Sequence, residues 1–218
     1  MDHFSENETQ SDSFLTLAGR SEGNYKDRGS KFLYFALPVN SEEEIKTQLA
    51  SLRKAYFDAS HHCYAWVLGQ DGSSFRANDD GEPNHSAGDP ILGQIRSNQL
   101  TNVLIVVVRY FGGTKLGVSG LIQAYKTAAA LAIEANQILQ EWVKIKLELR
   151  FPYPAMNEVM KVVKAKGLTI ISQEMALDCM LTLSFRAGLK NEVLEKLEEI
   201  EALSVRLDRT THQGIPLP

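Results

Sequence analysis

The sequence of 218 residues predicts an α+β protein built from two domains. Three observations favour this class. An unbroken apolar run from Val103 to Val108 has the length and the β-branched composition of a strand buried on both faces. A glycine-rich loop and a helical pattern follow this strand directly. The last third of the chain has a different hydrophobic pattern, with four short strands and two helices in the order βαββαβ. This change of pattern indicates a second domain.

The first 12 residues are polar and acidic, and we expect a disordered tail there without a signal peptide. A first domain is expected over residues 13–138. Its expected strands are Phe14–Gly19, Lys31–Val39, Cys63–Leu68, Ser73–Ala77 and Val103–Val108. The third and fourth of these strands form a hairpin, because Asp71-Gly72 is a strong turn signal between them. The polar segments Asn24–Ser30 and Asn78–Asp89 are expected to be loops.

Three helices are expected in the first domain. Ser41 with Glu44 three residues later is a capping box, and Ile45, Leu49 and Leu52 then line one face of the helix. Pro90 suits the first turn of a short helix over Pro90–Asn98. A third helix begins after Gly120 and runs to about Asn136.

The second domain is expected over residues 143–211, with the boundary near residues 137–143. Apolar and charged residues alternate from Val143 to Arg150, which marks a half-buried strand. The remaining expected elements are a helix at Pro154–Lys166, strands at Leu168–Met175 and Cys179–Phe185, a helix at Asn191–Leu203 and a strand at Val205–Arg209. The order βαββαβ is that of the ferredoxin-like plait.

Composition limits the possible functions. The chain has a net charge of −4, which argues against indiscriminate coating of nucleic acid, so any polyanion site must be a local basic patch. The two cysteines, Cys63 and Cys179, lie in different predicted domains without a CxxC partner, so neither a disulfide scaffold nor a thiolate zinc site is expected. No run approaches the roughly 20 apolar residues of a membrane span. We therefore expect a cytoplasmic protein without membrane contact.

The glycine loop, residues 112–120, is the main candidate site. Four glycines fall within nine positions between the central strand and a helix start, where unpaired backbone amides and the positive end of the helix dipole suit an anion. The spacing matches neither a Walker A motif nor a dinucleotide fingerprint. The alternative is that the glycines only permit tight turns and close packing. The residues expected to form this nucleic-acid or anion site are Arg109, Tyr110, Gly112, Gly113, Lys115, Gly117, Gly120 and Tyr125.

The acidic loop, residues 78–83, places the three carboxylates Asp79, Asp80 and Glu82 within four positions. Such a group is able to hold Mg²⁺ or to act as an acid–base pair. Alternatively, Asp79 and Asp80 cap turns while Glu82 pairs with Arg109 or Lys115. We favour structural pairing that shapes a cleft, and we expect no metal site.

His61, His62 and Cys63 begin one predicted strand, and neighbouring strand residues point to opposite faces. The two histidines therefore do not share a metal. A Cys–His nucleophilic pair lacks a third group, so we favour a packed histidine and an inert, buried Cys63. No residue is assigned a catalytic role.

The predicted second domain carries a secondary basic surface. The sheet face opposite its helices is expected to hold Lys144, Lys146, Arg150, Arg186 and Arg206. This face suits RNA or an acidic protein, although it lacks the aromatic side chains on which RNA-recognition sheets stack bases.

Three stretches together resemble the IMPACT/YigZ family: Asp58–Trp66, Asp79–Leu92 and Val108–Gly117. The last stretch is close to the family signature Arg-Tyr-Phe-Gly-Gly-x-Lys-Leu-Gly. The resemblance implies an N-terminal domain like the second domain of ribosomal protein S5. The βαββαβ tail is similar to the small domain of bacterial members, which implies a likeness to the last domain of elongation factor G. Both likenesses, and the control of a translation-regulating kinase by eukaryotic relatives, point towards translation.

This chain departs from the family pattern at two positions. Asp89 stands where the family usually has lysine, and Gln123 where it often has arginine or lysine. These changes remove positive charge near the glycine loop, while Lys115 and Arg109 remain.

The function expected from the sequence is that of a non-enzymatic regulator or binding module linked to translation. Its expected partner is RNA, the ribosome or a translation-associated protein, and no cofactor is expected. Two alternatives stay open: a metal-assisted hydrolase of a phosphorylated substrate and a pure protein-interaction module. The sequence does not indicate the oligomeric state.

Overall fold

The computed structural model describes residues 12–208, which form two compact units. The N-terminal unit comprises residues 14–141, and the C-terminal unit comprises residues 142–208 together with residues 12–13. Most of the predicted tail (residues 1–11) and the end of the predicted second domain (residues 209–211) lie outside the described residues. Asp12 is described, and its carboxylate accepts hydrogen bonds from Arg186 and from the amide of Gly188.

A five-stranded antiparallel sheet with the strand order β2-β3-β6-β4-β5 is the centre of the N-terminal unit. Its strands are β2 (Ser21–Asp27), β3 (Ser30–Pro38), β4 (His61–Leu68), β5 (Ser74–Asn78) and β6 (Val103–Tyr110). As the sequence predicts, β6 is the middle strand, and the side chains from Val103 to Val108 are fully buried. A strand with apolar residues on both sides needs a helix layer on each face.

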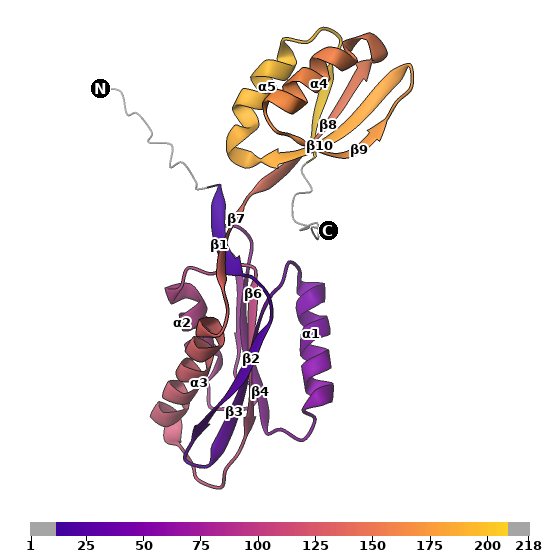
Figure 1. The fold of residues 1–218 in the computed structure, drawn as a ribbon. Coiled ribbons are helices and arrows are strands. Elements are labelled where there is room, and N and C mark those ends of the chain that lie inside the picture. The colour runs from indigo at the N-terminus through magenta and orange to yellow at the C-terminus, as the bar shows by residue number, and fades with distance from the viewer. Residues whose placement is uncertain (1–11, 209–218) are drawn as a thin grey trace, which may run out of the picture. The chain divides into compact units, whose positions relative to one another are not determined.

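Helices supply these two layers (Figure 1). The helix α1 (Glu42–Ala55) packs on one face, where Val106 and Val108 of β6 point. The helices α2 (Gly88–Ser97) and α3 (Gly117–Glu134) pack on the other face. The predicted N-cap of α1 is present, because the Ser41 hydroxyl accepts from the amide of Glu44 at 3.2 Å, while the Glu44 carboxylate accepts from the amide of Asn40 and not from that of Ser41.

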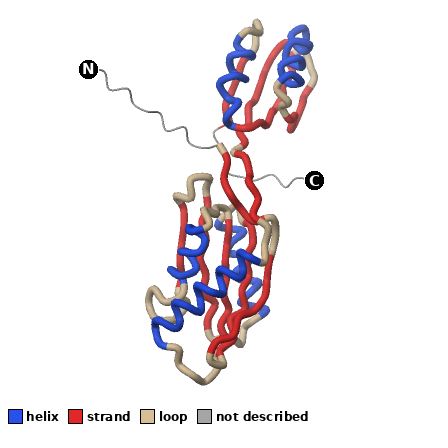
Figure 2. Tube along the Cα trace, turned by 60° about the vertical axis from the view of Figure 1, so that its left-hand side comes forward, coloured by secondary structure: helices blue, strands red, loops and turns tan. Residues whose placement is uncertain are grey.

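Two strands were not expected from the sequence. The segment Asn24–Ser30, predicted as a loop, belongs largely to β2, which pairs with β3 along the sheet edge. Alternate residues of β2 point to solvent and are polar, so the strand has little apolar signal. The strand β7 (Ile138–Trp142) lies where a domain boundary was expected. It pairs with β1 (Ser13–Leu17) in a separate two-stranded sheet, and Figure 2 shows these two strands side by side.

The C-terminal unit contains a four-stranded sheet with the order β11-β8-β10-β9. Its elements in chain order are β8 (Lys144–Pro152), a 3-10 turn (Tyr153–Ala155), α4 (Met156–Ala165), β9 (Thr169–Glu174), β10 (Asp178–Arg186), a 3-10 turn (Ala187–Leu189), α5 (Lys190–Glu198) and β11 (Ser204–Asp208). Both helices pack on the same face of the sheet, which leaves the other face open (Figure 1). The helix α5 ends before the predicted Leu203, because the following turn places Ala202 in the left-handed region with φ +58°.

The whole described chain is thus an α+β protein. None of the helices within residues 12–208 is both long and apolar enough to cross a membrane.

Candidate functional site

The end of β6 separates two predicted site residues onto opposite faces of the sheet. Val103, Ile105 and Val107 point towards α2 and α3, and the alternation of a strand places Arg109 on this same side. Tyr110 points to the α1 side, where its hydroxyl donates to Asp58 at 2.8 Å. This hydrogen bond raises the pKa of Tyr110. The prediction that Arg109 and Tyr110 line one cleft is therefore wrong, because it overlooked strand alternation.

A buried polar network lies below the glycine loop. Arg109 is 5% exposed and donates from Nη1 to Oε1 of Glu82 at 2.6 Å. The hydroxyl of Tyr125 donates to the same oxygen at 2.8 Å. Arg109 also donates from Nη2 to the hydroxyl of Ser30 at 3.3 Å. Further hydrogen bonds from Tyr125 and to Ser30 support this buried ion pair, whereas the buried Nε atom of Arg109 has no hydrogen-bond partner among the described residues.

Cys63 and His61 border this network. The Cys63 thiol contacts the Tyr125 hydroxyl at 3.3 Å and the backbone oxygen of Asp79 at 3.0 Å. Burial raises the pKa of the Cys63 thiol, so the nucleophilic thiolate is disfavoured, and burial also raises the pKa of Tyr125. His61 lies 3.9 Å from Glu82 and hydrogen-bonds through Nδ1 to the backbone oxygen of Asp80. The interpretation of Cys63 as a buried, inert thiol fits this geometry.

Each carboxylate of the acidic loop already has protein partners. The Asp79 side chain accepts from the amides of Ala87 and Gly88 at 2.9 and 2.8 Å, and so caps the start of α2, which has no cap of its own. Asp80 accepts from Arg53 at 2.7 Å and from the amide of His62. These contacts match the structural alternative considered from the sequence. Within residues 12–208, no group of three His, Cys, Asp or Glu residues is arranged to hold a metal ion.

His62 lies on the α1 side of the sheet, opposite to its neighbour His61. Its Nε2 atom is buried, and no hydrogen-bond partner for this atom is found in the described part of the chain. Burial lowers the pKa of His62, although Asp80, 3.9 Å away, acts in the opposite direction. The neutral ring is therefore favoured in the folded protein.

The glycine loop has a tightly packed start and an open remainder. A Cβ atom on Gly112 would overlap the backbone carbon of Gly29, so only glycine fits. Gly113 and Gly117 have φ values of +85° and +72°, and a Cβ atom on either residue would meet open space. Gly120 lies against Leu116 inside the first turn of α3, which begins at Gly117 and so earlier than predicted. Backbone conformations with positive φ favour glycine and turn the chain from β6 into the helix.

The backbone amides in and beside this loop have few acceptors among residues 12–208. The amides of Phe111 and Gly112 donate weakly to the hydroxyls of Ser60 and Ser30, each at 3.3 Å. Beyond them, no acceptor within residues 12–208 engages the amides of residues 113–115, and α3 has no side-chain cap. The side chain of Lys115 is exposed and makes no ion pair with any described residue. The arrangement combines free donors, a helix start and a cation, which are the elements of an anion site.

The structure thus divides the predicted anion-site residues into three groups. Arg109 and Tyr125 are interior and bonded to Glu82, while Tyr110 lies on the far face. The loop glycines and Lys115 remain at the surface. Sequence reasoning missed Ser30, Ser60 and the exposed Phe111, of which only Phe111 carries a signal, as a large apolar residue inside a glycine-rich loop.

The secondary basic face is present on the open side of the C-terminal sheet. The burial of β8 alternates, which places Lys144, Lys146 and Arg150 on the side away from the helices. Arg186 is engaged by Asp12 and stacks 3.3 Å over the Trp142 ring. The register pairs Arg206 with Glu148. A hollow of about 330 Å³ lies beside Arg150, but Glu174 and Asp178 also line it, so it is not uniformly basic.

The two departures from the family pattern have local partners. Asp89, on the exposed first turn of α2, accepts a hydrogen bond from Nδ1 of His85 at 2.6 Å. Gln123 donates to the Thr127 hydroxyl at 3.2 Å along α3. Neither side chain contacts Lys115 within the described residues.

Comparisons with known proteins agree with one another. Residues 28–133 match the family model of the Impact N-terminal domain. An IMPACT family member of Thermus thermophilus is 40% identical over 141 residues, covering 64% of this chain and 74% of the relative. YvyE of Bacillus subtilis, also an IMPACT family member, is 37% identical over 113 residues, covering 52% of each chain. The matched region thus spans about half of YvyE.

One solved structure resembles nearly the whole chain. A crystal structure described as that of a hypothetical protein has a TM-score of 0.71 and 27% identity. The match covers 91% of this chain and 98% of that chain. It supports the α+β fold over both units.

Proposed function

Because the chain belongs to the IMPACT family, we propose that it is a non-enzymatic binding module linked to translation, which engages RNA, free or on the ribosome, through the glycine loop. The observation that carries this proposal is the start of α3. The backbone amides of residues 113–115 have no hydrogen-bond acceptor within residues 12–208, and the side chain of Lys115 is exposed next to them. The carboxylates of the acidic loop accept from other groups. Phosphate groups are the anions that such donors bind in nucleic acids.

The charges near the loop support an anionic ligand. Glu82 would repel phosphate if it were free, but Arg109 neutralises it inside the fold. Asp80 is neutralised in the same way by Arg53. Lys115 has no such counter-ion within residues 12–208, so its charge is available for a ligand.

The finer fold relationships belong to the same proposal. We propose that the N-terminal unit is like the second domain of ribosomal protein S5 and that the C-terminal unit is like the last domain of elongation factor G. The βαββαβ element order and the sheet order β11-β8-β10-β9 support the second relationship. A cytoplasmic location and the absence of a cofactor are likewise proposed.

Filter binding of RNA at low and at physiological salt, with ribosome co-sedimentation, tests this function. Lys115→Ala should weaken RNA binding and make the slope of log K against log salt shallower by about 0.7 for single strands. Lys126→Ala is the matched control, because Lys126 is exposed on the same helix beyond the loop. Absence of RNA affinity even at low salt, together with absence of ribosome association, would contradict the proposal.

A protein partner is the second candidate. Phe111, Val118 and Ile122 are exposed large apolar residues within or beside the glycine loop. Such a patch is typical of protein-interaction surfaces. Partner capture that persists after nuclease treatment and is lost in Val118→Asp would favour this candidate over RNA. The hydrolase alternative gains no support, because the carboxylates of the acidic loop are engaged in structural contacts.

A further inference from the structure

Two exposed phenylalanines lie on neighbouring segments at the sheet end that carries the glycine loop. Phe57 is 83% exposed in the turn after α1, and Phe111 is 50% exposed after β6. Burying a phenylalanine side chain normally stabilises a fold, so these two positions give up that stabilisation. Their exposure therefore suggests a ligand with apolar, flat surfaces.

Hydrogen bonds hold the two segments together. The amide of Ser60 donates to the backbone oxygen of Arg109 at 2.9 Å, and the amide of Phe111 donates to the Ser60 hydroxyl at 3.3 Å. Tyr110 ties β6 to Asp58, the residue after Phe57. The Arg109 guanidinium lies 5.6 Å from the centre of the Phe111 ring and supports it. The aromatic rings are thus carried by a fixed framework.

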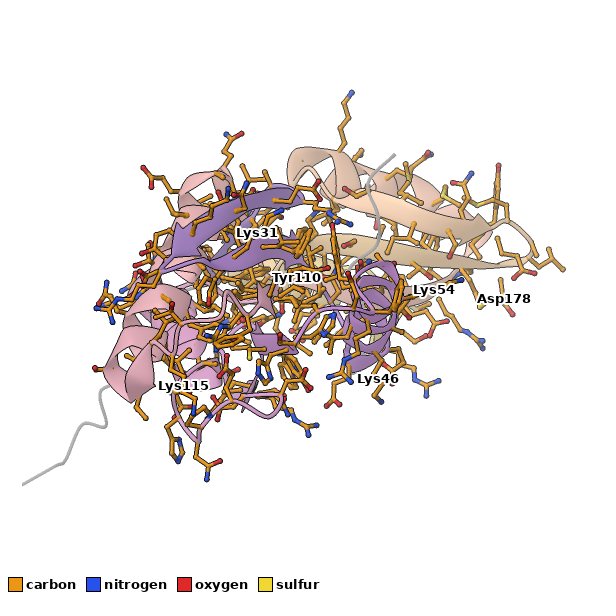
Figure 3. All side chains as sticks on the ribbon, turned by 90° about the horizontal axis from the view of Figure 1, so that it is seen from below. Lys31, Lys46, Lys54, Tyr110, Lys115 and Asp178 are labelled. Atoms are coloured by element: carbon orange, nitrogen blue, oxygen red, sulfur yellow. The ribbon has the colours of Figure 1, made fainter. Side chains whose placement is uncertain are left out.

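Three exposed lysines lie at the same end of the unit. Lys31 is paired in register with Tyr110 across β3 and β6, and in Figure 3 Lys54 and Lys115 lie on opposite sides of Tyr110. All three lysines are exposed, and none forms an ion pair with a described residue. At the tip of the β2–β3 hairpin, Asp27 and Arg28 offset each other in charge. The three lysines therefore bring positive charge to this end of the unit.

Two of the carboxylates at the same end are paired with arginines, whereas Asp58 accepts from a neutral hydroxyl and keeps its charge. Asp58 accepts from Tyr110, Asp80 from Arg53, and Glu82 from Arg109. The lysines are therefore free for phosphate while the acidic groups are held by protein donors. A combination of exposed aromatic faces and a cationic surround is the pattern of proteins that bind single-stranded nucleic acid.

We propose that this end of the N-terminal unit binds single-stranded RNA, with bases stacked on Phe57 and Phe111 and phosphates held by Lys31, Lys54 and Lys115. This inference rests on the proposed function and adds the strandedness of the ligand. A duplex hides its base faces inside the helix, so it offers nothing to the two rings. The open C-terminal sheet, in contrast, is basic without outward aromatic residues among its predicted contact positions.

The test compares three labelled probes on the full chain: a short oligouridine, an abasic strand of the same length, and a duplex of the same length. The oligouridine should bind most tightly, since only it offers unstacked bases. Phe57→Leu and Phe111→Leu should each weaken oligouridine binding roughly fivefold to a hundredfold, with little effect on the abasic strand. Phe75→Leu is the control, because Phe75 is similarly exposed on β5 but is stacked under Arg96.

The outcomes distinguish base stacking on the two phenylalanines from RNA binding in general. Equal binding of the abasic strand and the oligouridine, unaffected by the phenylalanine variants, would overturn base stacking while the RNA function stands. Tighter binding of the duplex than of the oligouridine would likewise overturn base stacking while the RNA function stands. No binding of any probe at low salt would overturn both. Because Phe57 is almost fully exposed, Phe57→Leu should fold normally, and its circular dichroism spectrum checks this.

Discussion

Glu82 is the residue on which the interior below the glycine loop depends. One carboxylate oxygen accepts from Arg109 and Tyr125, and His61 lies at 3.9 Å from it. The Tyr125 ring also packs edge-on against Phe32, with the ring centres 5.2 Å apart. Removing one partner of a buried ion pair leaves the other charge without compensation, so residues of this network should be sensitive to substitution.

Glu82→Ala should lower the free energy of unfolding by about 3–5 kcal/mol, because it leaves the Arg109 guanidinium buried and unpaired. Tyr125→Phe should cost about 1 kcal/mol, since it removes the hydrogen bond to Glu82 while the Cys63 thiol keeps its contact with the Asp79 backbone oxygen. Urea unfolding followed by the fluorescence of buried Trp66 measures both, in a Trp142→Phe background that leaves Trp66 as the only tryptophan. An equal, small cost for the two variants would contradict a structural role for the ion pair.

The stability should depend on pH through His62. Its pKa is lower in the folded protein than in the unfolded chain, where it is about 6.5, so the unfolded chain binds the proton more readily. The contribution of His62 to the free energy of unfolding is therefore fully present above a pH of about 6.5, and it is lost as the pH falls towards the folded pKa. The groups that act on His62 are the side chains of Asp80, Arg53 and His61 and the backbone of Tyr56.

Unfolding at pH of about 7.5 and about 5.5, on either side of the unfolded histidine pKa, checks this dependence. His62→Gln should lose less stability on acidification than the parent protein. His85→Gln serves as the control, because His85 is a surface residue whose ring is 81% exposed. A parent-like loss of stability in His62→Gln would assign the pH dependence to other groups.

Among the elements, the connection from β6 to α3 depends on the close approach of two backbones. Gly112 lies against the turn between β2 and β3, so the position of the glycine loop is fixed by the edge hairpin. Gly113 needs its positive φ but has open space around it. The two neighbouring glycines are therefore required for different reasons.

Gly112→Ala should destabilise the protein more than Gly113→Ala does. The first substitution forces a Cβ atom into the Gly29 backbone, whereas the second costs about 1–2 kcal/mol for a left-handed alanine. The unfolding assay with Trp66 compares them directly. A larger effect for Gly113→Ala would show that the β2–β3 hairpin yields easily and does not fix the loop.

The sequence predicts the elements whose signals are local. The N-cap at Ser41, the hairpin around Asp71-Gly72 and the apolar run of β6 each depend on a few adjacent residues. The strands β2 and β7 form because they pair with other segments of the chain, β3 and β1. Their alternating exposed residues carry no local signal of this pairing. In the site, the pairing of Glu82 with Arg109 was among the alternatives, but the face of Tyr110 and the partners Ser30 and Ser60 depend on tertiary register.

At the scale of the whole molecule, the position of the charges matters more than their sum. The net charge is −4, but many carboxylates of the N-terminal unit near the glycine loop are bonded to protein donors. Among residues 12–208, the lysines without an ion pair include those at the glycine-loop end of the N-terminal unit and those on the open sheet of the C-terminal unit. Only the first combines them with free amides and exposed aromatic rings, and we therefore place the RNA contact there.

The most direct measurement is a ¹H–¹⁵N correlation spectrum of the full protein titrated with single-stranded RNA. Binding at the start of α3 predicts that the amide signals of Gly113, Gly117 and Gly120 shift progressively. The signals of Gly69 and Gly72, in the turn between β4 and β5, should stay in place. Unchanged glycine-loop amides, with shifts confined to β8 and β10 of the C-terminal unit, would contradict the account.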